Sequence, residues 1–241
     1  MTLHVGNNNI VNIHHGSDRI YRVYKGSDLV WRTYKTNEVV FESATPGVTY
    51  IDLRTGGRYR ITTIGAGGGG CGNGASGTSY SAATGAAGGG LIVDTLLPIG
   101  RIGIAVGAGG AGTGGGDYSG PAGGTGENSH IYWYSDPEGH DETFICRSTG
   151  GGGGRAWFRG GWSLGTPGSP STGSYITDTI TSVTGSAGSG GANSGYIFTC
   201  PVPITGINYG NGGRAMGSGS GYAYIGDNGS NGYVKIVFLG E

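Results

Sequence analysis

Charged residues are scarce in this sequence, and neither sign dominates. They make up 12% of the 241 residues, with 14 lysines and arginines against 15 aspartates and glutamates, which gives a formal net charge of −1. A protein that holds nucleic acid or an anionic membrane through its overall charge needs a basic surface. We therefore expect no nucleic-acid partner.

Long hydrophobic runs and cysteine clusters are also missing. No stretch of 18 apolar residues occurs, and the N-terminus lacks the basic and apolar regions of a secretion signal, so we expect cytoplasmic synthesis without membrane insertion. Cys71, Cys146 and Cys200 are odd in number and widely spaced. This spacing argues against a disulfide framework and a C-x-x-C metal or redox site, and predicts three unpaired thiols.

The sequence also lacks the periodic apolar spacing of helices, and this lack decides how two glycine motifs are interpreted. Gly65–Gly70 and Gly107–Gly112 both match the G-x-G-x-x-G spacing of dinucleotide-binding folds. In those folds a helix follows, and its N-terminus faces the pyrophosphate. Here more glycine follows, without apolar residues at a 3.6-residue spacing. Chance matches are expected among 58 glycines, so we predict neither a nucleotide site nor any other cofactor.

The sequence does contain short β-branched and aromatic runs, separated by glycine blocks. The runs predict an all-β protein, with strands at 39–42, 49–53, 58–64, 91–97, 101–106, 130–134, 143–147, 155–158, 196–199, 221–225 and 233–239. The blocks at 65–90, 107–126, 150–154, 185–195 and 206–221 are mostly longer than ordinary loops. Small residues and aromatics punctuate them, which favours packed polyglycine-II-like segments over flexible linkers.

The first 42 residues repeat with a period of ten. Gly6–His15, Gly16–Lys25 and Gly26–Lys35 align, and Thr36–Glu42 is a degraded fourth copy. Each unit reads as a polar turn followed by a short strand, which predicts a small β-meander. We expect a compact β-module at 1–42 that serves for attachment, before a glycine-rich β-sandwich domain at 43–241. Its attachment side chains would be Tyr21, Tyr24, Trp31 and Tyr34, which exceed what so small a sheet can bury.

Candidate catalytic and metal-binding groups have simpler interpretations. Asp136–Glu142 holds four carboxylates and a histidine, but it lies between two predicted strands and contains ordinary turn chemistry. A solvated hairpin loop is favoured there, with a metal site as the open alternative. His14 and His15 read as a surface pair, because no acidic partner recurs near them at a fixed spacing. We predict no enzymatic activity and no catalytic or metal-ligating residues.

Two regions resemble known proteins. The order "RYRITTIGAGGGG", then "GRIGIAVGAGGAGTGGG", then the terminal "GSNGYVKIVFLGE" resembles glycine-rich domains of bacteriophage tail-fibre and other virion proteins. The N-terminal "RIYRVYKGSDLVWRTYK" is similar to short Tyr/Gly/Trp repeats of phage tail proteins. The resemblance implies a β-sandwich with polyglycine-II-like loops, a place in the virion after synthesis in the bacterial host, and a structural or host-binding role.

The expected function is therefore that of a virion structural protein, either a tail-fibre or receptor-binding component or a purely structural tail, collar or capsid-associated protein. Expected partners are other virion proteins, further copies of the chain with a trimer favoured, and a host-surface glycan or protein. A secreted antifreeze or lectin-like binder is the weaker alternative. Aromatics within glycine loops supply apolar faces for a receptor, and the candidates are Tyr80, Tyr118, Trp157, Trp162, Tyr209 and Tyr222. The alternative for about half of these rings is inward packing.

Overall fold

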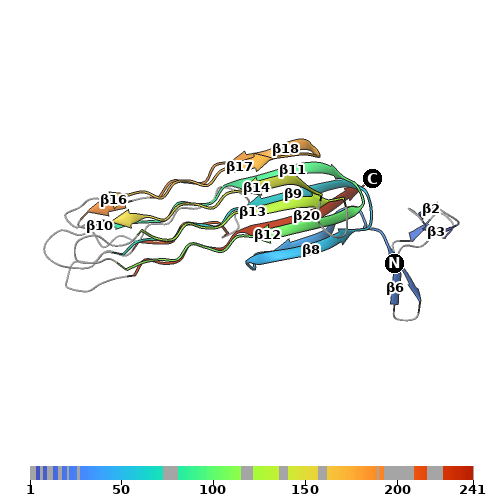
Figure 1. The fold of residues 1–241 in the computed structure, drawn as a ribbon, viewed down its shortest axis with the longest axis horizontal. Helices are drawn as coiled ribbons and strands as arrows, with labels where there is room; N and C mark the ends of the chain where they lie inside the picture. Colours follow the sequence, from blue (N-terminus) through green and yellow to red (C-terminus); the bar gives the residue numbers. More distant parts are fainter. Residues whose placement is uncertain are drawn as a thin grey trace.

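The described part of the chain is built from β-strands and extended segments and contains no helix, which confirms the all-β prediction for these residues. The computed structural model describes residues 4–5, 8–9, 13–15, 18–20, 22–25, 28–72, 81–114, 122–135, 141–156, 162–188, 190–192, 209–215 and 225–240. Among them, accordingly, no helix is present that could cross a membrane. The molecule is elongated, with two packed sheets at one end and long wavy segments running away from them (Figure 1).

One sheet has the strand order β18-β11-β9-β20-β7, with all neighbours antiparallel. Its strands are β7 (Glu38–Ser43), β9 (Gly57–Ile64), β11 (Gly90–Leu97), β18 (Ile176–Val183) and β20 (Tyr233–Gly240). Along β9 the residues are alternately buried and exposed up to Ile61. This two-residue period turns Tyr59 and Ile61 toward the core and Arg58 and Arg60 toward solvent.

The second sheet has the order β17-β14-β13-β12-β8, again antiparallel. Its strands are β8 (Gly47–Leu53), β12 (Gly100–Val106), β13 (Ser129–Tyr134), β14 (Glu142–Ser148) and β17 (Pro170–Thr172). Ile102, Ile104 and Ile131 face Ile61 and Ile236 of the first sheet in one shared apolar core. The two sheets therefore form a β-sandwich, and this hydrophobic core stabilises it.

The N-terminal repeats form separate hairpins, not one continuous meander. In the described residues β1 (His4–Val5) pairs with β2 (Asn8–Asn9), β3 (Ile13–His15) with β4 (Asp18–Ile20), and β5 (Arg22–Lys25) with β6 (Asp28–Arg32). Each pair brackets one of the repeat glycines Gly6, Gly16 and Gly26 in the sequence. The β3–β4 pair joins the first repeat unit to the second, and the β5–β6 pair joins the second to the third. Among the described residues these pairs are separate two-stranded sheets, so no further pairing links them into a meander.

The boundary of the N-terminal module lies earlier than the predicted 42/43. β7, which contains most of the degraded fourth repeat, pairs with β20 inside the sandwich. Upstream of it, the buried hydroxyls of Thr33 and Thr55 lie 2.7 Å apart. The sandwich therefore begins near Thr33, and Glu38–Ser43 serves as one of its edge strands.

Long extended segments leave the sandwich and return to it, and together they form what we call the glycine bundle. It comprises residues 65–72, 84–89, 107–114, 122–128, 149–154, 164–169, 184–188, 209–215 and 225–232. β9, β12, β14 and β18 continue outward into it, and β11, β13, β17 and β20 receive the returning chain (Figure 1). Four short strands lie farther out: β10 (Ser81–Ala83) pairs with β19 (Gly190–Ala192), and β15 (Arg155–Ala156) pairs with β16 (Trp162–Ser163).

The segment 65–72 lies inside the bundle, and its hydrogen bonds rotate with a period of three. Gly65 and Gly68 donate to segment 84–89, while Ala66 and Gly69 donate to segment 122–128. Gly67 and Gly70 donate to segment 225–232. The carbonyls of 66–70 accept in the same rotation from segments 149–154, 107–114 and 209–215. Bonding to a new neighbour at each residue, without internal bonds, is the pattern of a threefold extended helix packed among parallel rods.

Close approach of backbones explains why these positions are glycine. A Cβ placed on Gly67, Gly68 or Gly69 would lie well under 3.0 Å from a neighbouring carbonyl oxygen. Among the described bundle glycines, only Gly210 has a positive φ. Most of these glycines are therefore needed because neighbouring segments lie too close for a side chain, and not because the backbone is left-handed.

Polar side chains cap amides on the perimeter of the bundle. The amide of Gly112 donates to the Asn228 Oδ1 atom at 2.8 Å, and the amide of Gly109 to the Asn231 Oδ1 atom at 3.2 Å. Asn128 accepts from Gly150 in the same way. Each of these side chains takes the place of a carbonyl that a neighbouring segment would supply inside the bundle. The outer amides that they cap are therefore hydrogen-bonded although the bundle ends there.

Candidate binding surfaces

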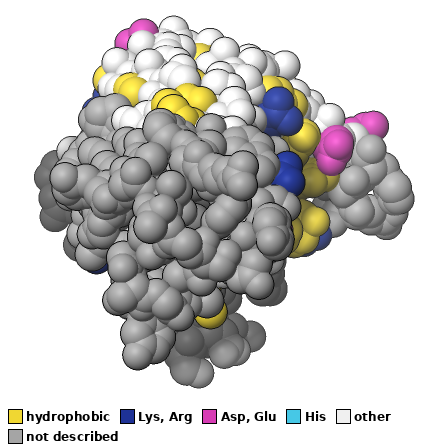
Figure 2. Space-filling view, turned by 90° about the vertical axis from the view of Figure 1, so that its left-hand side faces the viewer, with side chains coloured by type: hydrophobic (Ala, Val, Ile, Leu, Met, Phe, Trp, Pro, Cys, Tyr) yellow, Lys and Arg dark blue, Asp and Glu magenta, His cyan; other side chains and the backbone are white. Residues whose placement is uncertain are grey.

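Most predicted receptor-contact residues lie in the sequence between segments of the bundle. Tyr80, Tyr118, Trp157 and Tyr222 lie outside the described residues. The backbone of Trp162 belongs to β16, next to β10 and β19, while its side chain lies outside the described part. Seen from the far end of the bundle, the described surface is mostly backbone and small polar groups with some hydrophobic side chains (Figure 2).

Tyr209 occupies a different place from the one predicted. Its ring stacks on Tyr233 with centroids 4.9 Å apart and planes 7° apart, and it packs beside the buried Ile64 and Ala87. It is half-buried where the bundle joins the sandwich. The alternative of inward packing therefore applies to Tyr209.

The predicted attachment aromatics are also only partly described. Tyr21 lies outside the described residues, and of Tyr24 and Trp31 only the backbone in β5 and β6 is described. Tyr34 is 5% exposed, and its ring lies 6.3 Å from Tyr59 and 5.7 Å from Phe238. The prediction that Tyr34 is an exposed attachment residue was wrong, because its ring packs into one end of the sandwich core.

The acidic loop and the cysteines are partly described. β13 and β14 pair on either side of the loop at 136–142, as predicted for a hairpin. Of that loop Asp141 and Glu142 are described, and the described residues hold no group of three or more potential metal ligands. Cys71 and Cys146 are buried, and burial raises the pKa of Cys146 to about 12. Cys200 lies outside the described residues.

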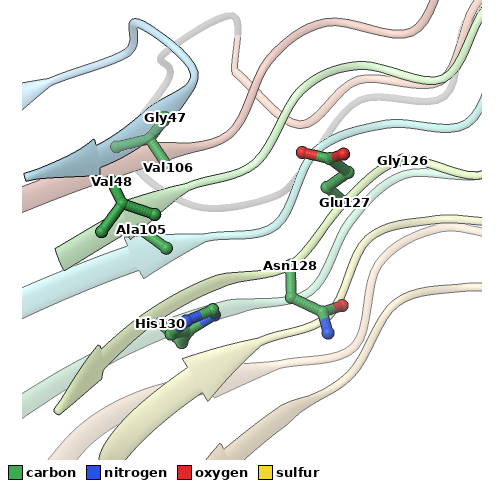
Figure 3. A pocket seen from close by; sticks show the side chains of 8 residues that line it. All are labelled: Gly47, Val48, Ala105, Val106, Gly126, Glu127, Asn128 and His130. Carbon is green, nitrogen blue, oxygen red and sulfur yellow. The ribbon is translucent and has the colours of Figure 1, made fainter. Parts of the chain in front are cut away.

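The solvent face of the second sheet carries a groove that the sequence did not predict. Gly103 of β12 lies between Tyr50 of β8 and Tyr132 of β13, and Ala105 lies between Val48 and His130 in the next row. The small residues form the floor and their large neighbours the walls. Two hollows of about 430 and 260 Å³ share Val48, Ala105 and His130, so they are parts of one groove along β12. Figure 3 shows the residues that line the larger hollow.

Aromatic rings form most of the walls of this groove. The Tyr50 and Tyr134 rings lie 6.0 Å apart, close above Gly103. On the β13 side His130 packs edge-on against Tyr132 at 5.3 Å, and Tyr132 lies 5.6 Å from Phe144. Tyr50 and Val48 are 58% and 64% exposed, so their faces are open to a ligand.

Polar groups lie at both ends of the groove. Glu127 and Asn128 line the end next to the bundle, and Glu142 accepts a hydrogen bond from the Tyr134 hydroxyl at the other end. Burial and the nearby Arg147 lower the pKa of His130, which favours its neutral form at physiological pH. Burial and the neighbouring Tyr50 and Glu142 raise the pKa of Tyr134, so its hydroxyl stays protonated.

The predicted strands 49–53, 101–106 and 130–134 contain most groove residues, but the groove itself depends on register. Side-chain alternation along each strand does not show that Tyr50, Gly103 and Tyr132 share one face of the sheet. The pairing of β12 with β8 and β13 aligns these three residues in one row. Compared with known proteins, the chain matches no family model, and no curated protein sequence is significantly similar to it.

Proposed function

We propose that this chain is a non-enzymatic component of a bacteriophage virion, a tail-fibre or receptor-binding protein. In this proposal the N-terminal hairpins attach it to the particle, and the glycine bundle presents its terminal loops to the host. The glycine bundle is the observation that carries the proposal. Backbone hydrogen bonds on several sides hold each inner segment, so loops at its far end are supported by a rigid stem.

Antibody labelling of purified virions in electron micrographs tests the location. Gold label at fibre tips supports the proposal, whereas label confined to the collar or capsid favours a purely structural protein. Truncation of residues 1–32 is expected to leave a folded sandwich that no longer joins particles. Incorporation of the truncated chain at normal copy number would remove the attachment role.

Adsorption of the purified chain to host cells tests the loops. Tyr118→Ala and Trp162→Ala are expected to reduce cell binding with little change in melting temperature, as for exposed contact residues. Tyr209→Ala is the matched control, because its ring stacks at the junction and its loss should lower stability first. Unchanged adsorption by both loop variants would contradict receptor contact through these aromatics.

A further inference from the structure

We propose that the groove along β12 binds an uncharged saccharide chain, with the sugar rings lying along β12 against Tyr50 and Tyr132. This site lies on a flank of the sandwich and is built from described residues. It does not depend on the loops contacting a host.

The shape of the groove suits a flat, elongated ligand. Its floor is low at Ala105, which contributes only a methyl group between Val48 and His130, while the Tyr50 and Tyr134 rings lie close above Gly103. The hollow continues from Tyr134 at one end to Asn128 at the other, over about 20 Å at the rise of a β-strand. Several rings of a linear chain fit along such a length.

The walls match the two chemical faces of a sugar. A pyranose presents apolar C–H groups on its ring face and hydroxyls around its edge. Tyrosine rings pack against the apolar face and keep a hydroxyl for bonding. Asn128, Glu127 and Glu142 add polar side chains at the ends. A mostly apolar concavity with a few polar groups is typical of a ligand site.

The charges around the groove favour a neutral ligand. The nearby cations are engaged: Arg101 pairs with Asp52 at 3.0 Å, and the Arg147 guanidinium lies over Phe144. His130 is held toward its neutral form, while Glu127 and Glu142 contribute negative charge. A phosphorylated or uronic-acid chain would meet the two carboxylates, and Arg147 beside His130 would offset only part of their repulsion.

The backbone of the groove argues against an extended peptide. β12 is hydrogen-bonded to β8 on one side and to β13 on the other. Its amides and carbonyls are therefore used within the sheet, and a peptide lying on this face would find no backbone partners. Sugar hydroxyls need only the side chains that line the groove.

Affinity electrophoresis of the full chain through gels containing dextran, mannan or galactomannan tests the proposal, with polygalacturonate as the anionic comparison. We expect retardation by at least one neutral polysaccharide. Tyr50→Ala should weaken it about tenfold, the value of one lost stacking contact, and Val48→Gln should weaken it less. Tyr50→Phe keeps the ring and should retain most binding. Tyr175→Ala, which removes a 40% exposed tyrosine outside the groove, should leave binding unchanged.

Several results would overturn the proposal. These are no retardation in any neutral gel, stronger retardation by polygalacturonate, or equal retardation of wild type and Tyr50→Ala. Sedimentation of the same variants completes the test, since a change of oligomeric state in Tyr50→Ala would make the groove a contact between copies of the chain. Host adsorption is measured separately, so failure of this site and failure of the loop proposal are distinguishable.

Discussion

The sandwich and the glycine bundle differ in how they arrange the hydrogen bonds of the backbone. In the sandwich each strand bonds to neighbours in one plane, and side chains fill the space between two sheets. In the bundle each inner segment bonds to neighbours all around it, and no space for a side chain remains at most of its glycines. One region is stabilised mainly by burying apolar side chains, and the other by hydrogen bonds between closely packed backbones.

This difference determines what each region tolerates. A sandwich core accepts another apolar side chain of similar volume, because the volume filled matters more than its detailed shape. At positions such as Gly67, Gly68 and Gly69 the bundle accepts no other residue, since even a methyl group there meets a carbonyl oxygen. Substitutions that remove atoms should therefore harm the sandwich, and substitutions that add atoms should harm the bundle.

The largest effect is expected from a deletion in the sandwich core. Phe238 is 1% exposed, and its ring packs against Tyr34 and Tyr59. Phe238→Ala should lower the free energy of unfolding by about 3–5 kcal/mol, measured by urea denaturation. Phe238→Leu is the control and should cost clearly less, because most of the volume stays filled. Equal losses in both variants would contradict a packing role for this ring.

An added methyl group in the bundle should have the next largest effect. Gly69→Ala places a Cβ against the Ala111 carbonyl, which belongs to the backbone and cannot rotate away. We expect a loss of about 3 kcal/mol, the upper end for overpacking, with faster hydrogen exchange at residues 67–70. In Gly56→Ala the nearest heavy atom lies 3.6 Å away, an ordinary contact. That variant should exchange and unfold like the wild type, and similar behaviour of Gly69→Ala would refute the close-packed bundle.

Removal of a perimeter cap should have a smaller effect. Asn228→Ala deletes the acceptor of the Gly112 amide, and water can partly replace it at the surface. A loss of about 1 kcal/mol is expected, with faster exchange of the Gly112 amide. Asn228→Asp keeps an acceptor and should stay near wild type. If the alanine variant exchanges no faster, this hydrogen bond does not cap the bundle.

The smallest effect is expected for the acid sensitivity of stability, through Glu42 on the edge strand β7. The Tyr233 hydroxyl and Lys235 lower the pKa of Glu42, which bonds them at 2.6 and 3.2 Å. The resulting stabilisation is complete above the ordinary glutamate pKa of about 4.3 and is lost as the pH falls through the lowered value. Melting temperatures from pH 6 to about pH 2.5 should therefore decline less in Glu42→Gln than in the wild type. Parallel curves would show that this carboxylate is uncoupled from folding.

Local sequence patterns determined the strands and the turns between several of them. Alternation in Arg58–Ile64 and Arg101–Val106 located β9 and β12 within one residue, because a half-buried strand needs one apolar and one polar face. The exposed strand β18 was missed, since most of its side chains face solvent and leave no such contrast. β7 was found as a strand but assigned to the wrong unit, because its partner β20 lies almost two hundred residues away.

The sequence by itself thus determined that the chain is all-β and that glycine-rich blocks separate its strands. Tertiary structure alone decided which glycine faces which carbonyl, that Tyr34 and Tyr209 pack inward, and that Tyr50 and Tyr132 flank Gly103. Glycine carries no side chain by which its neighbours could be identified, and strand register couples residues far apart in the chain. Both the bundle and the groove therefore depend on long-range backbone pairing, which local patterns do not encode.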